Sequence, residues 1–158
     1  VVIGVDDTDN KEKGATWSLM NEIAHRMENA GYGHYLLHTI TQLYTKNPVR
    51  TTNCVSISVT FASDRPDELV DAFQKELKRL TLSENTAMAV YKKILIPDAL
   101  RRYGEAVKSR IVDIREAYDI AKEVGIETIP ITGERGIIGA IAALAFSDSP
   151  EEAVKVYA

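Results

Sequence analysis

The chain has 158 residues, of which 45% are hydrophobic and 27% are charged. These values are typical of a globular protein of about one domain, and they argue against a chain that is disordered throughout. Nineteen lysines and arginines against 23 aspartates and glutamates give a formal net charge of −4. This balance argues against a protein whose whole surface adheres to phosphate backbones. The single cysteine, Cys54, excludes an intramolecular disulfide and a paired-cysteine zinc motif.

The sequence also bears on location. Its longest apolar runs fall short of the roughly 20 residues that a membrane-spanning helix needs, and its start does not read as a signal peptide. We therefore expect a cytoplasmic protein with no membrane partner. Because the chain starts at Val1 rather than at Met, we expect the sequence to be trimmed.

The first part of the chain predicts six elements from its apolar spacing and its turn residues. In chain order they are a strand over residues 1–5, a helix over about 15–30, two strands over 34–45 and 51–61 that form a hairpin, a helix over 64–80, and a strand over 86–94. This βαββαβ order is typical of a ferredoxin-like sheet with two helices on one face. The predicted fold class is therefore α+β.

The second part of the chain is mostly helical in pattern. Its segments are residues 97–103, 114–124, a short run over 126–131, 136–146, and an amphipathic piece from residue 150. We expect residues 95–158 to form a helical extension of the ferredoxin-like core of residues 1–94. The extension either covers the sheet or enlarges it, within one compact domain.

Three aspartates, Asp6, Asp7 and Asp9, follow the first predicted strand. Alternation along the strand sends Asp7 and Asp9 to one side and Asp6 to the other, so at least two carboxylates should converge. Two like charges ~4 Å apart repel by about 4 kcal/mol at an effective dielectric of ~20, so the cluster calls for a cation, a proton or basic neighbours. Mg²⁺ prefers such oxygen ligands together with nucleotide phosphates. The alternative is a plain strand end that caps the next helix.

The segment after the aspartates contains residues that favour a bound anion. Lys11, Lys13 and Gly14 precede Thr16, near a predicted helix start where free backbone N–H groups attract phosphate. The loop lacks the full Walker pattern GxxxxGK[ST], so a nucleotide site here would be of another type. Thr16 either takes part in phosphoryl transfer or caps the helix with its hydroxyl.

Two further stretches contain candidate phosphate-binding residues. The first is the hairpin tip over residues 46–53, which includes Arg50 and Asn53 in an otherwise acidic chain; an ordinary solvated turn explains it equally well. The second is the glycine-rich stretch over residues 133–140, where Arg135 and Gly136 lead into a helix of small residues. The small residues most simply permit close packing on the sheet, whereas an arginine at a helix entrance is suited to phosphate.

These stretches resemble the archaeal isoleucine-tRNA agmatinylcytidine synthetases. GVDDTD at residues 4–9, with Gly14 and Thr16, resembles the family's opening GIDDTD…GGCTT. Residues 47–53 resemble its NP…KT.GN segment in shortened form, and residues 133–143 resemble its G.RG.IGALAA motif. GATW at residues 14–17 and NPVRTTNCVS at residues 47–56 look closer still to methanogenesis marker protein 11, a relative of unknown activity.

The resemblance implies an ATP-dependent domain beside a ferredoxin-like domain. In the synthetases, a phosphate from ATP activates the wobble cytidine of a tRNA, and agmatine then displaces that phosphate. Carried over to this sequence, Asp6, Asp7 and Asp9 would hold Mg²⁺ and the ATP phosphates, and Thr16 falls at the family's phosphorylated threonine.

Our hypothesis is therefore a Mg²⁺-dependent, ATP-using phosphoryl-transfer domain of kinase or ligase type, with no acceptor assigned. The predicted catalytic residues are Asp6, Asp7, Asp9 and Thr16, and the predicted nucleotide contacts are Thr8, Lys13, Gly14, Asn53, Arg135 and Gly136. A tRNA is a candidate partner through Arg50 and its neighbours or through further domains. The sequence departs from the family's motifs at Ala15 and Trp17 and in its shortened hairpin segment. These departures agree better with use of ATP than with tRNA as the substrate. The alternative is a non-catalytic RNA- or protein-binding module of methanogen physiology.

Overall fold

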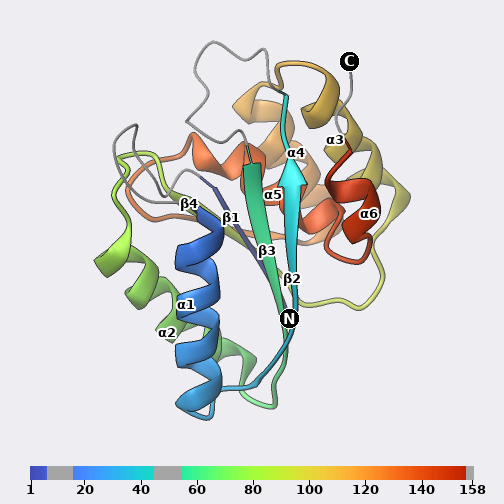
Figure 1. Cartoon of the computed structure of the whole chain (residues 1–158). Helices are drawn as coiled ribbons and strands as arrows, with labels where there is room; N and C mark the ends of the chain where they lie inside the picture. The colour runs from blue at the N-terminus through green and yellow to red at the C-terminus, as the bar shows by residue number, and fades with distance from the viewer. Residues whose placement is uncertain (7–15, 45–54, 156–158) are drawn as a thin grey trace.

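The computed structural model describes residues 1–6, 16–44 and 55–155. The elements, in chain order, are β1 (Val2–Asp6), α1 (Thr16–Asn29), β2 (His34–Gln42), β3 (Val55–Ala62), α2 (Pro66–Leu80), β4 (Ala87–Tyr91), α3 (Asp98–Ser109), α4 (Ile114–Val124), β5 (Glu127–Pro130), α5 (Gly136–Ala145) and α6 (Pro150–Ala153) (Figure 1). Each predicted segment contains an observed element, although α3 ends six residues after the predicted segment 97–103. Residue 45 and residues 51–54 of the two predicted hairpin strands lie outside the described residues.

The strands form one sheet in the order β2-β3-β1-β4-β5. Each neighbouring pair is antiparallel. The first four strands have the order and directions of a ferredoxin-like βαββαβ unit, so the predicted fold class is confirmed. β1 lies in the middle of the sheet and is buried along its whole length, which explains why its sequence is a continuous apolar run up to Asp6.

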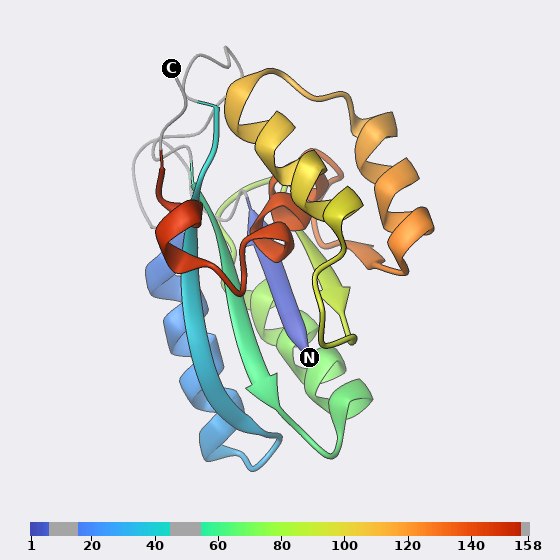
Figure 2. The same ribbon diagram turned by 90° about the vertical axis from the view of Figure 1, so that its right-hand side faces the viewer.

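Helices cover both faces of the sheet (Figure 2). Because side chains alternate along β1, Ile3 and Val5 pack in the core beneath α1 and α2. Val2 belongs to the second core, which includes residues of α3, α4 and α5 on the opposite face. Helices α3, α4 and α5 therefore lie over this second face of the sheet.

The extension also enlarges the sheet. Residues 126–131, a short run in a mostly helical stretch, contain the strand β5, which pairs with β4 at the sheet edge. β4 itself ends at Tyr91, three residues before the predicted end, because its partner β1 begins at Val2 opposite Tyr91. The boundary between core and extension at residue 94 stays a prediction.

Helix α5 lies directly on β1. A methyl group at position 4 would overlap the carbonyl oxygen of Ala140 and lie 3.3 Å from Cγ of Leu144. Only a glycine on β1 allows this approach of helix to strand. None of the helices in the described segments is both long and apolar enough to span a membrane.

Candidate functional site

The predicted site residues divide into two groups. Asp6, Thr16, Arg135 and Gly136 are described by the structure. The remaining predicted residues, Asp7, Thr8, Asp9, Lys13, Gly14, Arg50 and Asn53, lie outside the described residues. The site is therefore built here from the first group and from the residues that surround it.

Asp6 is the last residue of β1, and its side chain faces α5. It has the same parity along the strand as Val2 and Gly4, which pack toward the C-terminal helices. The residue is 9% exposed. A methyl group at position 139 would overlap Oδ2 of Asp6 and lie 2.7 Å from its Cγ. The Asp6 carboxylate therefore lies against the backbone of α5. Only a glycine at position 139 leaves room for it there.

The first residue of α5, Gly136, is wedged between two strands. A methyl group there would lie 2.8 Å from the Asp6 carbonyl oxygen, 2.8 Å from the Ala87 nitrogen and 2.7 Å from the Asn85 carbonyl oxygen. The Gly136 N–H donates to the Asn85 carbonyl over 3.0 Å. The fold thus brings the aspartate motif and the glycine-rich motif together, and it confirms that the small residues of α5 permit close packing on the sheet.

The other two described residues surround this point less closely. Arg135 directly precedes α5 with a helical backbone and an exposed residue surface, so it stands at the positive end of the helix. Thr16 is the first residue of α1 and is 2% exposed. It lies at the same end of the sheet as the end of β1 (Figure 1), but α1 packs on the face opposite to the Asp6 side chain.

A polar segment over residues 81–86 forms one wall of the site, and the sequence analysis missed it. The Thr132 hydroxyl donates to the Ser83 carbonyl over 2.8 Å and accepts the Thr86 N–H over 3.0 Å. The Ile131 N–H donates to the Thr86 carbonyl over 3.0 Å. These bonds hold the loop that leads into α5. The predicted fold could have indicated this segment, because a strand β4 that is antiparallel to β1 must start beside the end of β1.

Tyr103 of α3 is the second residue that the sequence analysis missed. It is 8% exposed, and its hydroxyl donates to the Ile138 carbonyl in the first turn of α5 over 2.8 Å. Burial raises the pKa of this hydroxyl far above its ordinary value, and the negative charges of Glu116 and Asp6 raise it further. Amphipathic spacing identifies Tyr103 as a buried residue but does not indicate which carbonyl it meets.

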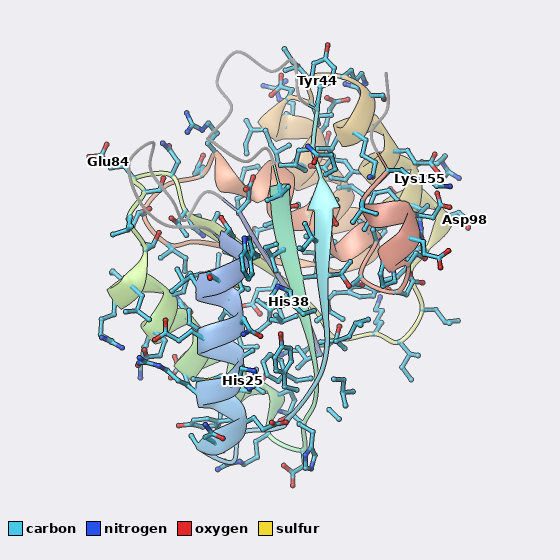
Figure 3. All side chains as sticks on the ribbon, viewed as in Figure 1. His25, His38, Tyr44, Glu84, Asp98 and Lys155 are labelled. Atoms are coloured by element: carbon cyan, nitrogen blue, oxygen red, sulfur yellow. The ribbon has the colours of Figure 1, made fainter. Side chains whose placement is uncertain are left out.

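Metal ligation rests on residues that are only partly described. Within the described segments, no group of three or more His, Cys, Asp or Glu side chains could hold a metal ion. Of the three predicted aspartate ligands, Asp6 alone is described. Glu84 lies by the end of the sheet where β1 finishes, whereas His25 lies along α1 and His38 along β2, away from that end (Figure 3). The histidines therefore add nothing to the site.

The comparisons with known proteins agree with one another, because the family model, the sequence relatives and the solved structures all include TiaS. The model of the TiaS TCKD domain matches residues 2–68. An uncharacterized protein of Methanocaldococcus jannaschii is 46% identical over 158 residues, and the isoleucine-tRNA 2-agmatinylcytidine synthetase TiaS of Pyrococcus horikoshii is 30% identical over 150 residues. The crystal structure of TiaS in complex with its isoleucine tRNA and ATP superposes with a TM-score of 0.83 at 22% identity and covers 91% of this chain. This likeness shows a shared fold.

The relatives are longer than this chain. The alignment covers 99% of this chain but 53% of the M. jannaschii protein, and 91% of this chain but 35% of the P. horikoshii synthetase. The structural match likewise covers 35% of the TiaS chain in the complex with tRNA and ATP. The chain therefore spans about half of one relative and about a third of the other.

Proposed function

We propose, from the membership of this chain in the TiaS-like superfamily, that it is an ATP-binding phosphoryl-transfer domain that uses Mg²⁺. The observation that carries the proposal is the contact between the two motifs. The Asp6 carboxylate lies against Gly139, and the start of α5 at Gly136 is wedged between the ends of β1 and β4. A carboxylate beside a helix N-terminus can hold a cation and an anionic phosphate at adjacent positions.

The described residues fit such a nucleotide. Asp6 supplies a hard oxygen ligand of the kind that Mg²⁺ prefers, while α5 supplies the positive end of a helix and Arg135 a fork of donors for phosphate. When bound, Mg²⁺ would neutralise developing charge on the phosphates. We assign Asp7 and Asp9 as further ligands, and Thr8, Lys13, Gly14, Asn53 and Gly136 as nucleotide contacts.

Thr16 is the proposed phosphoryl-accepting residue of the chain itself. Thr16 is the first residue of α1, and α1 begins at the end of the sheet where β1 finishes (Figure 1). Because Thr16 is 2% exposed, its hydroxyl has to become accessible to the donor before a phosphoryl group can be transferred to it. A tRNA remains the proposed further partner, through Arg50 and its neighbours, and the final acceptor is open.

An RNA-binding module that stacks bases on an open sheet face is the weaker alternative. Such modules leave one face of a four-stranded sheet free for aromatic stacking. Here, in the part of the chain that the structure describes, α1 and α2 pack on one face and α5 on the other. Bases would therefore have to bind elsewhere.

Calorimetric titration with ATP, with and without Mg²⁺, tests the proposal. We expect Mg²⁺-dependent binding by the wild-type protein and at least roughly tenfold weaker binding by Asp7→Asn, because one carboxylate ligand loses its charge. Asp64→Asn makes the same chemical change at an exposed aspartate outside the motif and should bind like wild type. Full affinity in Asp7→Asn would remove the metal-site assignment.

A second experiment separates phosphoryl transfer from binding. After incubation with ATP and Mg²⁺, mass spectrometry should find a phosphate on Thr16, and Thr16→Val should abolish it while ATP still binds. A phosphate-free Thr16 in protein that binds ATP would leave a nucleotide-binding domain with no transfer to its own threonine.

A further inference from the structure

We propose that Tyr103 is a positioning residue of the nucleotide site, whose hydroxyl holds the first turn of α5 in register with Asp6. The inference rests on the proposed function, because it assigns a role in a site for ATP. It concerns a residue of α3, a helix that neither the aspartate motif nor the glycine-rich motif includes.

The position of the hydrogen bond is the first argument. The Tyr103 hydroxyl donates to the carbonyl of Ile138 over 2.8 Å. Ile138 stands between Gly136 and Gly139, the two residues at which α5 touches the end of β1. The Asn85 carbonyl holds the same turn from the β4 side through Gly136. The turn is thus held from two sides.

The small space between α5 and the Asp6 carboxylate is the second argument. Gly139 lies so close to the Asp6 carboxylate that a single methyl group would overlap it. A small rotation or translation of α5 therefore changes the space available to the carboxylate. The residues that α5 buries are apolar, and apolar contacts are not directional. A hydrogen bond to Ile138 is directional and can fix the helix at the point where precision matters.

The state of the hydroxyl is the third argument. Burial and the negative charges of Glu116 and Asp6 both raise the pKa of Tyr103. The hydroxyl therefore stays protonated and donates at any pH at which the protein would work.

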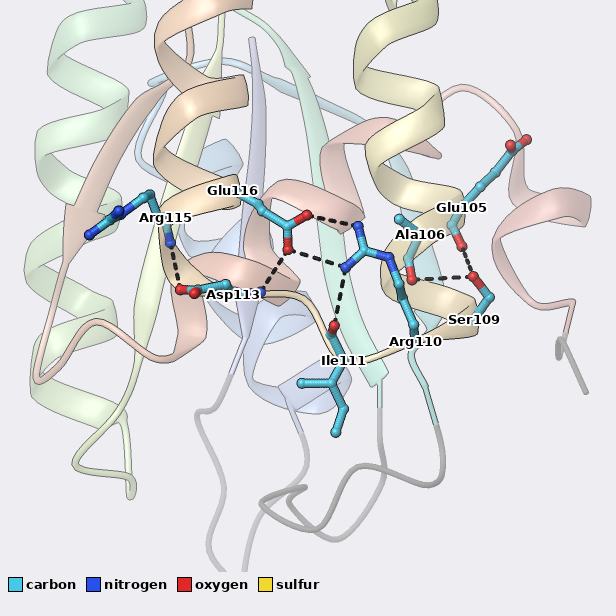
Figure 4. Close-up of polar contacts among 8 residues, drawn as sticks. All are labelled: Glu105, Ala106, Ser109, Arg110, Ile111, Asp113, Arg115 and Glu116. Atoms are coloured by element: carbon cyan, nitrogen blue, oxygen red, sulfur yellow. Dashed lines mark hydrogen bonds and ion pairs between the residues drawn. The ribbon is translucent and has the colours of Figure 1, made fainter.

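The anchoring of α3 is the fourth argument. Arg110 at its end forms an ion pair with Glu116 of α4 over 2.8 Å, and it also donates to the Ile111 carbonyl (Figure 4). Tyr103 and this ion pair line the same cleft of about 560 Å³ between α3 and α4. The Tyr103 hydroxyl thus extends from a helix that is itself tied to its neighbour.

Tyr103→Phe tests the role, because it removes the hydroxyl and keeps the ring. Tyr91→Phe is a matched control. Tyr91 is 1% exposed, and its hydroxyl donates to the Leu95 carbonyl over 2.6 Å. It is the last residue of β4 and pairs with Val2, at the other end of β1 from Asp6. Both changes remove one partly buried hydrogen bond to a backbone carbonyl. Only the first removes it at the proposed site.

We expect Tyr103→Phe to weaken ATP binding roughly five- to tenfold, which corresponds to the free energy of about one hydrogen bond, and to raise the Mg²⁺ concentration needed for half-maximal binding. Tyr91→Phe should stay within about twofold of wild type. In hydrogen exchange without nucleotide, the amides of residues 136–142 should exchange faster in Tyr103→Phe alone. This second measurement reports on α5 even if ATP affinity is low.

The outcomes separate the two proposals. If wild type binds ATP and the two variants bind alike, or if α5 exchanges at the wild-type rate in Tyr103→Phe, Tyr103 has no positioning role and the proposed function stands. If wild type does not bind ATP at all, the proposed function fails and the role of Tyr103 in a nucleotide site fails with it.

Discussion

The contact between α5 and the Asp6 carboxylate can be tested by adding one methyl group at Gly139. The added Cβ would overlap Oδ2 of Asp6 and lie 2.7 Å from Cγ and 3.0 Å from Cβ. The Asp6 side chain is short and is flanked by buried structure, with the residue 9% exposed. It cannot swing away without displacing its neighbours, so Gly139→Ala should disturb either the carboxylate or the helix.

Two opposing effects set the magnitude. Alanine is favoured over glycine inside a helix by about 1 kcal/mol, while inserting a group into a packed contact costs about 1–3 kcal/mol. In the wild-type background Gly139→Ala should therefore lower the free energy of unfolding by about 1 kcal/mol. In an Asp6→Ala background the overlapping oxygen is gone, and the 3.0 Å contact to Cβ is tight but can relax. There the same change should be neutral or stabilising by up to about 1 kcal/mol.

Urea unfolding of the four proteins in this double-mutant cycle measures the coupling. We expect a coupling free energy of about 1–2 kcal/mol, with unchanged m-values. Gly104→Ala is the control: its methyl group would lie 2.6 Å from Cβ of Ala145, within the α3–α5 contact, so its cost should not depend on Asp6. Equal effects of Gly139→Ala in both backgrounds, within about 0.5 kcal/mol, would refute the contact.

Three further predictions concern the frame of the site. Gly4→Ala should lower the free energy of unfolding by about 3 kcal/mol in urea titrations, because its methyl group overlaps the Ala140 carbonyl and α5 must lift off β1. Arg110 lowers the pKa of Glu116 from 4.5 to about 2. The free energy by which wild type is more stable than Glu116→Gln should therefore be fully present above pH 4.5 and disappear as the pH falls toward 2. Acid titrations followed by circular dichroism measure it. Burial lowers the pKa of Lys108 from 10.5 to about 8. The unfolded chain therefore binds more protons between these values, and wild type should gain stability relative to Lys108→Met as the pH rises from 8 to 10.5, measured by urea unfolding at each pH.

Several features of the fold were predictable because they depend on neighbours in the sequence. The continuous apolar run before Asp6 indicates a central strand, and its burial on both faces agrees. The apolar spacing of residues 64–80 predicts a helix with Pro66 in its first turn, and the observed α2 runs over Pro66–Leu80. The small residues of α5 predict close packing, which the contacts of Gly4 and Gly136 confirm.

Other features were not predictable from local pattern. The run over residues 126–131 lies in a stretch of mostly helical pattern, and only the pairing of β5 with β4 shows that it contains a strand that enlarges the sheet. The amphipathic spacing of α3 identifies a buried face, while the target of the Tyr103 hydroxyl follows from the way α3 packs on α5. The convergence predicted for the aspartates concerns Asp7 and Asp9, which lie outside the described residues, and stays a prediction.

By itself, the sequence determined the order of the strands and helices from β1 to β4, the fold class and the two motifs that are candidates for a nucleotide site. Periodicity, turn residues and motif spacing act over a few residues, so they can be read along the chain. The tertiary structure alone decided that the Asp6 carboxylate lies against the backbone of Gly139 and that the Tyr103 hydroxyl donates to the Ile138 carbonyl in the first turn of α5. Such contacts join residues far apart in the chain, and they arise from how whole helices pack on the sheet.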